Sequence, residues 1–185
     1  MPARGQPLVL AVGGCGGGAK QATPRADRPA KPPPGWRTVA NRRARFTIAA
    51  PKRWTARVRD GATLIRSHDR LVVVTVAADR TAPGRELPVS QYARETLQDL
   101  PEFDGSLSPR TGRVRGSPYR SAVVQGAGTV RASRRLQRIT VAALRVPGRA
   151  TFVVVVFRNA RVRPRFAAAT LRRVLRSLRA GVPRR

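Results

Sequence analysis

The stretch Ala150-Thr151-Phe152-Val153-Val154-Val155-Val156-Phe157 decides the fold of this chain. It follows Val146-Pro147-Gly148-Arg149, where Pro at the second place and Gly at the third are typical of a tight turn. Its β-branched and aromatic residues predict a strand, and because nearly every residue is apolar, both faces of that strand must be covered. A second run of this kind occupies residues 71–77, so the sequence predicts a sheet that is buried on both sides at its centre.

Short turns predict further strands that run antiparallel to their neighbours. Asp60-Gly61 is a strong signal for a two-residue hairpin turn, and Ser67-His68-Asp69 marks a second turn. Turns this short join antiparallel strands. Besides the two central strands, we expect strands at residues 45–49, 54–59 and 62–66, a short one at Val114, and a long hairpin formed by 119–130 and 136–146.

Two segments have the apolar spacing of amphipathic helices. One runs from Pro88 to Leu100 and is stopped by Pro101, and the other runs from Pro164 to about Arg179. Because two helices are available to cover a sheet that is apolar on both faces, we expect an α+β domain of the α/β/α sandwich type. Its mostly antiparallel sheet would have about six to seven strands and would be covered by helices on both faces.

The charge of the chain is high and unevenly placed. Among 185 residues, 38 are Lys or Arg and 9 are Asp or Glu, which gives a formal net charge of +29. Residues 105–185 hold 20 of the basic residues and none of the acidic ones. Hydrophobic residues make up 41% of the chain, too many for a disordered polycation. A field of this sign attracts anionic lipid head groups, nucleic acid or acidic glycopolymers.

Residue types exclude several classes of chemistry. With one Cys and one His, the chain has neither a disulfide framework nor the ligands of a Cys/His zinc site, and we expect no metal and no cofactor. No apolar run reaches the roughly 18 residues of a transmembrane helix. Ser67, His68 and Asp69 are adjacent on a tight turn, where they cannot converge on one proton as a catalytic triad does. We therefore expect a protein that is not an enzyme.

The first 35 residues have the composition of a signal-like segment and a tether. A short apolar stretch leads to Val12-Gly13-Gly14-Cys15, which resembles the lipobox of bacterial lipoproteins, whose Cys becomes the lipidated first residue. Residues 16–35 are rich in Gly and Pro and predict an extended spacer. The apolar stretch has five residues, against roughly 7–15 in a usual signal. Two alternatives stay open: a start upstream of Met1, or a flexible tail without signal function.

Three features of the folded part occur together. They are the opening Phe46-Thr47-Ile48-Ala49-Ala50-Pro51-Lys52-Arg53-Trp54, the helix at 88–100, and a C-terminal helix that ends Leu175-Arg176-Ser177-Leu178. In this order the chain resembles the PsbP-like lipoproteins of actinobacteria, including the LpqN type. The resemblance covers residues 36–180 and implies an α/β/α sandwich that serves as a binding or assembly domain without catalytic residues. The net charge of +29 departs from the family pattern.

These segments predict the organisation of the chain. Residues 1–15 form a signal-like segment that ends at the lipobox Cys15, 16–35 a tether, 36–180 a single α/β domain and 181–185 a basic tail. We expect a lipoprotein anchored on the extracytoplasmic face of the cell membrane that binds or assembles with a partner. The alternative is a basic cytosolic nucleic-acid-binding protein, which charge alone supports, because aromatic stacking residues and binding motifs are lacking.

The outer face of the C-terminal helix is the candidate contact surface. We expect its arginines to contact anionic lipid or acidic wall polymer, and the alternative is an ordinary solvated helix face. The candidate residues are Arg165, Arg172, Arg173, Arg176 and Arg179.

Overall fold

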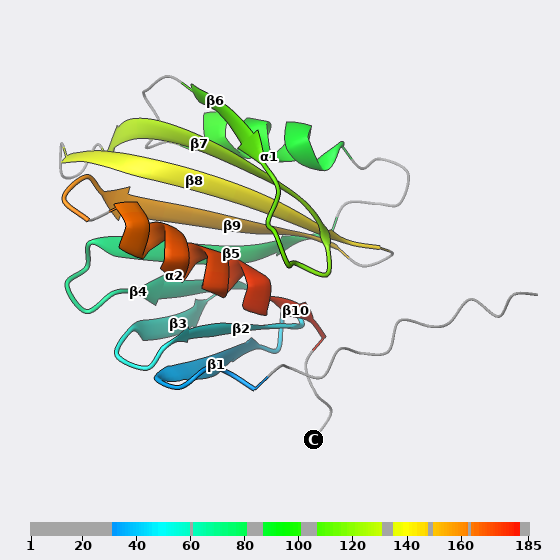
Figure 1. Ribbon diagram of the computed structural model, residues 1–185. Helices are drawn as coiled ribbons and strands as arrows, with labels where there is room; N and C mark the ends of the chain where they lie inside the picture. Colours follow the sequence, from blue (N-terminus) through cyan, green and yellow to red (C-terminus); the bar gives the residue numbers. More distant parts are fainter. Residues whose placement is uncertain are drawn as a thin grey trace, which may run out of the picture.

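The computed structural model describes residues 31–59, 61–80, 87–100, 107–130, 135–147, 150–162 and 164–181, the side chains of 107–111, 130, 135 and 164–167 excepted. Within these ranges, a seven-stranded antiparallel sheet has the order β3-β4-β5-β9-β8-β7-β6, and a small sheet has the order β1-β2-β10 (Figure 1). The strands are β1 Trp36–Asn41, β2 Phe46–Pro51, β3 Thr55–Arg59, β4 Ala62–Arg66, β5 Val72–Asp79, β6 Leu107–Gly112, β7 Arg120–Val130, β8 Arg135–Val146, β9 Ala150–Asn159 and β10 Arg179–Ala180. The helices are α1 Val89–Gln98 and α2 Pro164–Ser177.

Alternate residues of β8 pack against different helices. Its odd-numbered side chains from Ile139 to Ala143 share a hydrophobic cluster with α1, and its even-numbered ones from Ala142 to Val146 share another with α2. Because successive side chains of a strand point to opposite faces of a sheet, α1 and α2 lie on opposite faces of the large sheet. Figure 1 shows α1 behind β7 and β8, and α2 in front of β9.

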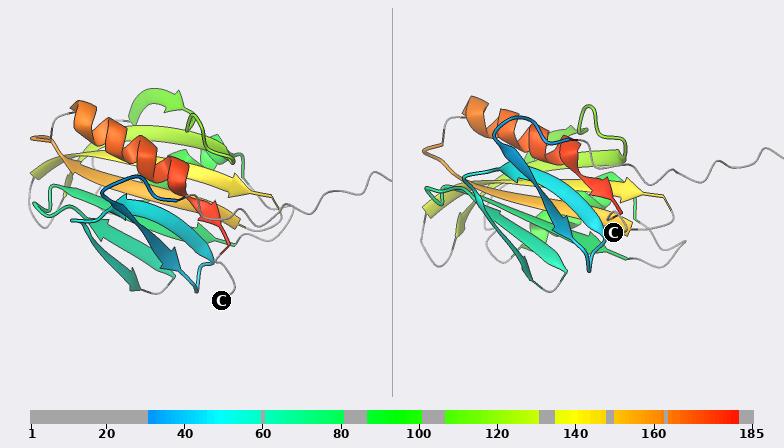
Figure 2. Two further views of the ribbon diagram at one scale, coloured as in Figure 1. Left: turned by 60° about the horizontal axis from the view of Figure 1, so that its bottom comes forward. Right: turned by 90° about the horizontal axis from the view of Figure 1, so that it is seen from below.

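The small sheet lies beside α2 (Figure 2). Strand β2 packs on α2, and the Ser177 hydroxyl at the end of α2 accepts a hydrogen bond of 2.8 Å from the Ala49 amide. Strand β10 then pairs with β2, so the chain returns to the small sheet directly after the helix. Helix α2 and the small sheet together cover one side of the central strands.

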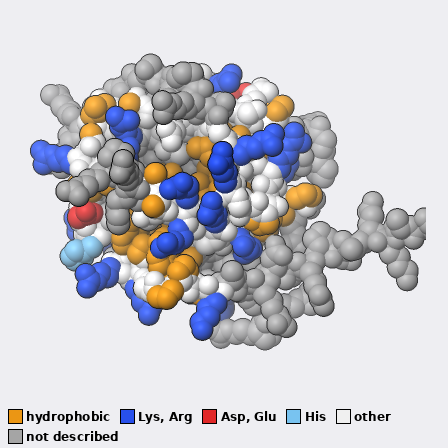
Figure 3. All heavy atoms as spheres, in the orientation of Figure 1, with side chains coloured by type: hydrophobic (Ala, Val, Ile, Leu, Met, Phe, Trp, Pro, Cys, Tyr) orange, Lys and Arg blue, Asp and Glu red, His pale blue; other side chains and the backbone are white. Residues whose placement is uncertain are grey.

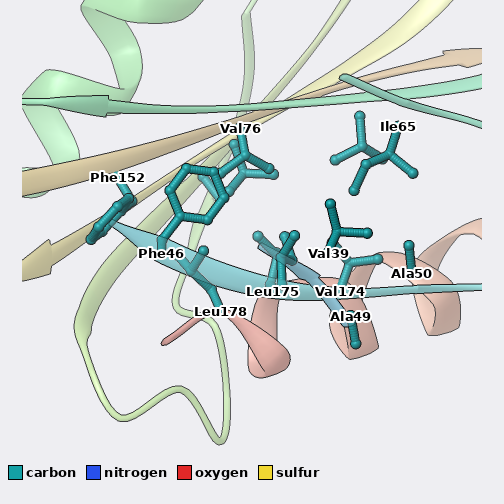
Figure 4. Packing of buried hydrophobic residues seen from close by; sticks show 14 of the residues in the cluster. Val39, Phe46, Ala49, Ala50, Ile65, Val76, Phe152, Val174, Leu175 and Leu178 are labelled. Carbon is teal, nitrogen blue, oxygen red and sulfur yellow. The ribbon is translucent and has the colours of Figure 1, made fainter. Parts of the chain in front are cut away.

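The centre of the core is the strand that the sequence marks as apolar on both faces. Residues Thr151 to Val156 of β9 are all buried. The Phe152 ring meets the ring of Phe46 edge to face, with centroids 5.5 Å apart and an interplanar angle of 75°. Figure 4 shows these two rings beside Leu178, where β2, β9 and the end of α2 come together. The prediction of a strand buried on both faces is confirmed for β9. The same prediction for residues 71–77 is confirmed for one face only, because the side chains of β5 alternate between buried and half-buried.

A buried amide joins the two sheets. Asn41, at the end of β1, donates hydrogen bonds from Nδ2 to the Gly61 carbonyl (2.9 Å) and to Thr63 Oγ1 on β4 (3.1 Å). Its Oδ1 accepts a hydrogen bond of 2.9 Å from the Ala44 amide. The side chain is fully buried and all of its polar atoms are bonded, so it fixes the small sheet against the edge of the large one.

Helix α1 is fixed on its face of the sheet by polar contacts around an apolar stripe. The hydroxyl of Tyr92 donates a hydrogen bond of 2.7 Å to the Asp79 carboxylate at the end of β5. Burial and this carboxylate raise the pKa of Tyr92, so the phenol stays protonated. The guanidinium of Arg145 on β8 donates to the Leu87 carbonyl just before the helix. The apolar stripe consists of Val89, Ala93 and Leu97.

The mostly antiparallel sheet and the two helices agree with the sequence prediction, and several details do not. The strand expected at 45–49 is β2, which lies in the small sheet and not in the large one. Val114 lies outside any strand, and the short strand before β7 is β6. Helix α2 ends at Ser177 because residues 179–180 pair with β2. Strands β1 and β10 were not expected, since β10 has two residues and β1 exposes half of its side chains.

A charge in the centre of β9 is expected to abolish folding. Val154 is fully buried, and an unpaired carboxylate there would cost several kcal/mol, a large part of the stability of a small domain. In Val154→Asp we therefore expect no cooperative thermal transition by circular dichroism. The matched control is Val58→Asp on the edge strand β3, where the side chain is 50% exposed and the melting temperature should hardly change. Equal melting temperatures for the two variants would contradict the central place of β9.

Candidate functional site

A groove of 790 Å³ runs along α2 on the face of the sheet that this helix covers. Its floor is formed by Val123 and Gln125 of β7 and Thr140 of β8. One wall is α2, and the other is the segment 112–115, which begins at the last residue of β6. This volume is within the range of about 300–1,000 Å³ that is typical of small-molecule sites. Figure 3 shows Lys and Arg side chains gathered over this face, with apolar surface exposed between them.

The register of the sheet places the polar floor residues beside the apolar centre. One row of direct cross-strand partners crosses the sheet. It consists of Gln125 on β7, Thr140 on β8, Val156 on β9 and Val74 on β5. The apolar half of the row lies under α2, and the polar half opens into the groove. The groove therefore begins where the helix no longer covers the sheet.

The segment 112–116 is held in place as the second wall. The Val114 amide donates a hydrogen bond of 3.0 Å to Ser121 Oγ on β7. Arg176 Nε on α2 donates one of 2.6 Å to the Arg115 carbonyl. Gly116 has a φ of +77°, a backbone conformation that favours glycine, and a Cβ there would lie only 3.1 Å from Arg176 Nε. These contacts join the two walls at one end of the groove.

Arginine is the charged residue of this groove. All four of its arginines are exposed, and among the described residues that line it there is no Asp or Glu. Two come from the segment and two from the helix: Arg113, Arg115, Arg172 and Arg176. Cations on both walls without a carboxylate between them form a local field that attracts anions.

A recess of 180 Å³ lies at the other end of the groove floor. Polar side chains from three adjacent strands line it: Gln125, Arg138, Thr140 and Arg158. A small cavity of 70 Å³ beneath α2 shares three of these residues with the recess and is otherwise mostly apolar. Its apolar lining consists of Trp54, Val72, Val74, Val156, Ala168, Leu171 and Val174. Recess, cavity and groove meet at Gln125 and Thr140.

Two cations face each other across β8 and β9 in this recess. Arg138 and Arg158 are direct cross-strand partners. Burial, and then the charge of Arg138, lower the pKa of Arg158. Arg158 Nη1 donates a hydrogen bond of 3.1 Å to the Val162 carbonyl, which orients the guanidinium. Like charges directly opposite each other in a sheet are destabilising, so this pair costs stability in the protein without a ligand.

The arginines expected on one helix face have different surroundings. Arg172 and Arg176 line the groove. Arg173 lies over the ring of Trp36, with its guanidinium carbon 5.5 Å from the centroid. Arg179 donates to the carbonyls of Arg176 (2.6 Å) and Leu178 (2.8 Å) and so satisfies the end of the helix. The side chain of Arg165 lies outside the described residues, as does Cys15.

The sequence analysis predicts only the helix arginines as a contact surface. The arginines that the large sheet and the 112–115 segment contribute could not be found from sequence. Alternation along 136–146 places Arg138 and Thr140 on one face, but it does not show which residue of β9 lies opposite. Arg113 and Arg115 carry no signal beyond charge, because they lie in an irregular segment whose position depends on α2.

The Ser67-His68-Asp69 triplet forms a turn. Ser67 Oγ donates a hydrogen bond of 2.5 Å to Asp69 Oδ1, which also accepts one of 3.1 Å from the Leu71 amide. These two bonds, the Ser67 hydroxyl first, lower the pKa of Asp69. His68 is exposed on this turn between β4 and β5. The Ser67 and Asp69 side chains therefore stabilise the turn.

Two absences hold within the part of the chain that the structure describes. No group of three or more His, Cys, Asp or Glu side chains there is placed to hold a metal ion. No helix there is long and apolar enough to span a membrane.

The fold is similar to that of the PsbP and Mog1 proteins. The Ran-binding protein Mog1p of Saccharomyces cerevisiae superposes with a TM-score of 0.55 at 11% identity, over 78% of this chain and 95% of Mog1p. The cyanobacterial PsbP (CyanoP) of Synechocystis sp. PCC 6803 gives 0.54 at 9% identity, over 79% and 92%. LpqN of Mycobacterium tuberculosis, which is involved in cell envelope biogenesis, gives 0.42 at 15%, over 82% of each chain.

The likenesses to Mog1p and CyanoP confirm a PsbP-like fold, and at identities of 11% and 9% they show the fold alone. No protein-family model matches the sequence, and the search of curated protein sequences gives no match. Any function of this chain must therefore be argued from its own residues.

Proposed function

We propose that this chain is a non-catalytic binding module, tethered through a lipid on Cys15 to the extracytoplasmic face of the cell membrane, whose basic face contacts an anionic partner. The observation that carries the proposal is the groove along α2. This groove has arginines on both walls, apolar surface between them and no carboxylate in its described lining. These are features of a site for an anionic ligand.

The anchor is supported by the sequence. Cys15 is the only Cys of the chain and follows two glycines, where a lipobox Cys would lie. Two acyl chains on that residue would give a stable attachment, which a single chain does not. The spacer 16–35 would reach at most about 60–70 Å from the membrane, which lets the domain contact the bilayer or wall polymer nearby.

The anionic partner is anionic lipid or acidic wall polymer. Residues 105–185, which supply every groove arginine, contain no acidic residue. The arginines of the C-terminal helix would take part in this contact to different degrees. They are Arg165, Arg172, Arg173, Arg176 and Arg179. Arg172 is exposed in the groove, whereas Arg179 is occupied with carbonyls at the helix end. Because the lipid already holds the protein, the contact would orient the domain and would not provide the attachment.

Binding to nucleic acid is the competing function. It would need exposed aromatic rings on the basic face for stacking. Among the described residues, the large exposed hydrophobic side chains are Val58 and Leu136, neither of them aromatic. Trp36 is buried under Arg173, and the hydroxyl of Tyr119 accepts a hydrogen bond from the Ala180 amide. The observations therefore favour contact with anionic lipid or acidic wall polymer over binding to nucleic acid.

Removing the lipid acceptor is expected to release the protein from membranes. The wild-type chain should sediment with the membrane fraction, and Cys15→Ser should move to the soluble fraction, because the thioether to the diacylglyceryl group can no longer form. Mass spectrometry of the native protein should find Cys15 as the modified first residue. A soluble wild-type chain with a free Cys15 thiol would contradict the anchor.

The unlipidated full chain is expected to bind anionic vesicles through the groove. Cys15→Ser should bind vesicles that contain phosphatidylglycerol and ignore pure phosphatidylcholine, and the affinity should fall steeply as salt shortens the Debye length from about 10 Å at 0.1 M. Adding Arg113→Gln and Arg172→Gln, one on each wall, should weaken binding about thirtyfold, at roughly 1 kcal/mol per arginine.

The matched control is the pair Arg57→Gln and Arg66→Gln. These exposed arginines lie on β3 and β4, with their side chains on the opposite face of the sheet from Ile65 and α2, so they should change binding little. Vesicle binding that ignores lipid charge and salt would contradict the anionic partner. Tighter binding to DNA than to vesicles would favour the competing function.

A further inference from the structure

The geometry points to a second ligand in the same protein: we infer that the recess between β7, β8 and β9 and the cavity beneath α2 bind a single-chain amphiphile with an anionic head group. The head group would occupy the recess, and the chain would lie beneath α2. The inference goes beyond the proposed function, because it depends on neither the lipid anchor nor contact with a surface.

The recess offers hydrogen-bond donors for an anion. Its polar lining consists of the Gln125 amide, the Thr140 hydroxyl and the guanidinium groups of Arg138 and Arg158. All four side chains can donate, and no Asp or Glu is among the described residues that line the recess. A carboxylate or phosphate head group would accept charge-assisted hydrogen bonds from the two arginines, the strong class of such bonds.

The two arginines are arranged unfavourably without an anion. They are direct cross-strand partners, and Arg158 is partly buried. The lowered pKa of Arg158, which burial and the charge of Arg138 cause, is consistent with this repulsion. A negative head group between the two guanidinium groups would convert the repulsion into two attractive contacts. An anion is therefore the ligand that this pair would select.

The apolar cavity supplies a place for a chain. It shares Gln125, Thr140 and Arg158 with the recess, so a ligand can occupy both without a break. At 70 Å³ the cavity has room for a short alkyl segment. Ala168 and Leu171 line both the cavity and the groove, so a longer chain would continue along α2. An inorganic anion would fill only the recess, and a neutral lipid would leave the two arginines unpaired.

The chain contains a built-in reporter for this site. Of its two tryptophans, Trp54 lines the apolar cavity and Trp36 contacts Arg173 on another part of α2. In a full chain that carries Cys15→Ser and Trp36→Phe, all tryptophan fluorescence comes from Trp54. A bromine atom quenches tryptophan on contact, so ω-bromooctanoate should quench this fluorescence in a saturable manner. The neutral ω-bromooctanol should need at least tenfold higher concentration for the same effect.

Variants separate the head-group site from the rest of the basic face. Arg138→Gln and Arg158→Gln should each raise the half-quenching concentration of ω-bromooctanoate at least tenfold, whereas Arg172→Gln should change it less than twofold. Arg138 is exposed, so its variant tests the site even if Arg158→Gln does not fold. With Cys15→Ser and Trp54→Phe, the remaining Trp36 should not be quenched.

Three results would overturn the inference. They are an unquenched Trp54, equal half-quenching concentrations for ω-bromooctanoate and ω-bromooctanol, and an unchanged half-quenching concentration in a folded Arg138→Gln variant. Vesicle binding by the Cys15→Ser chain together with an unquenched Trp54 would overturn this inference alone and leave the proposed function standing. Quenching of Trp54 without vesicle binding would overturn the proposed function and leave this inference standing.

Discussion

The apolar strand β9 is the constraint on which the rest of the structure depends. Its residues Thr151 to Val156 are buried on both faces, so each face of the sheet needs a cover. Helix α1 covers one face, and α2 with the small sheet covers the other, where Phe46 meets Phe152. The chain has a net charge of +29, yet among the described residues no Lys or Arg is buried, so the apolar centre holds no unpaired cation.

The cover on the α2 side is incomplete, and the candidate sites lie where it ends. Along β8, the side chains that face α2 change from Leu144 and Ala142, which are buried, to Thr140 and then Arg138, which are not. The chain thus becomes polar where the helix no longer covers the sheet. The arginines of the groove and recess are placed around this opening, beside apolar side chains of α2. An opening of this kind suits a ligand that is anionic at one end and apolar at the other.

Most of the large sheet and both helices could be predicted from sequence, because they depend on local signals. The apolar run at 150–157, the Asp60-Gly61 turn and the helix stripe that ends at Leu97 each act over a few residues. The small sheet could not be predicted, because β10 has two residues and is defined by its partner β2. The candidate sites depend on register and on packing across the chain. Arg138 meets Arg158 only because β8 and β9 pair as they do.

We expect the opening beside α2 to hold an anionic amphiphile. A crystal structure of the full-length Cys15→Ser chain with octyl phosphate tests it most directly. Phosphate oxygens should lie within hydrogen-bond distance of both guanidinium groups, Arg138 and Arg158, and the alkyl chain should lie beneath α2 beside Trp54. An octyl phosphate bound only at Arg113 and Arg172, with its chain in solvent and water alone in the recess, would contradict it.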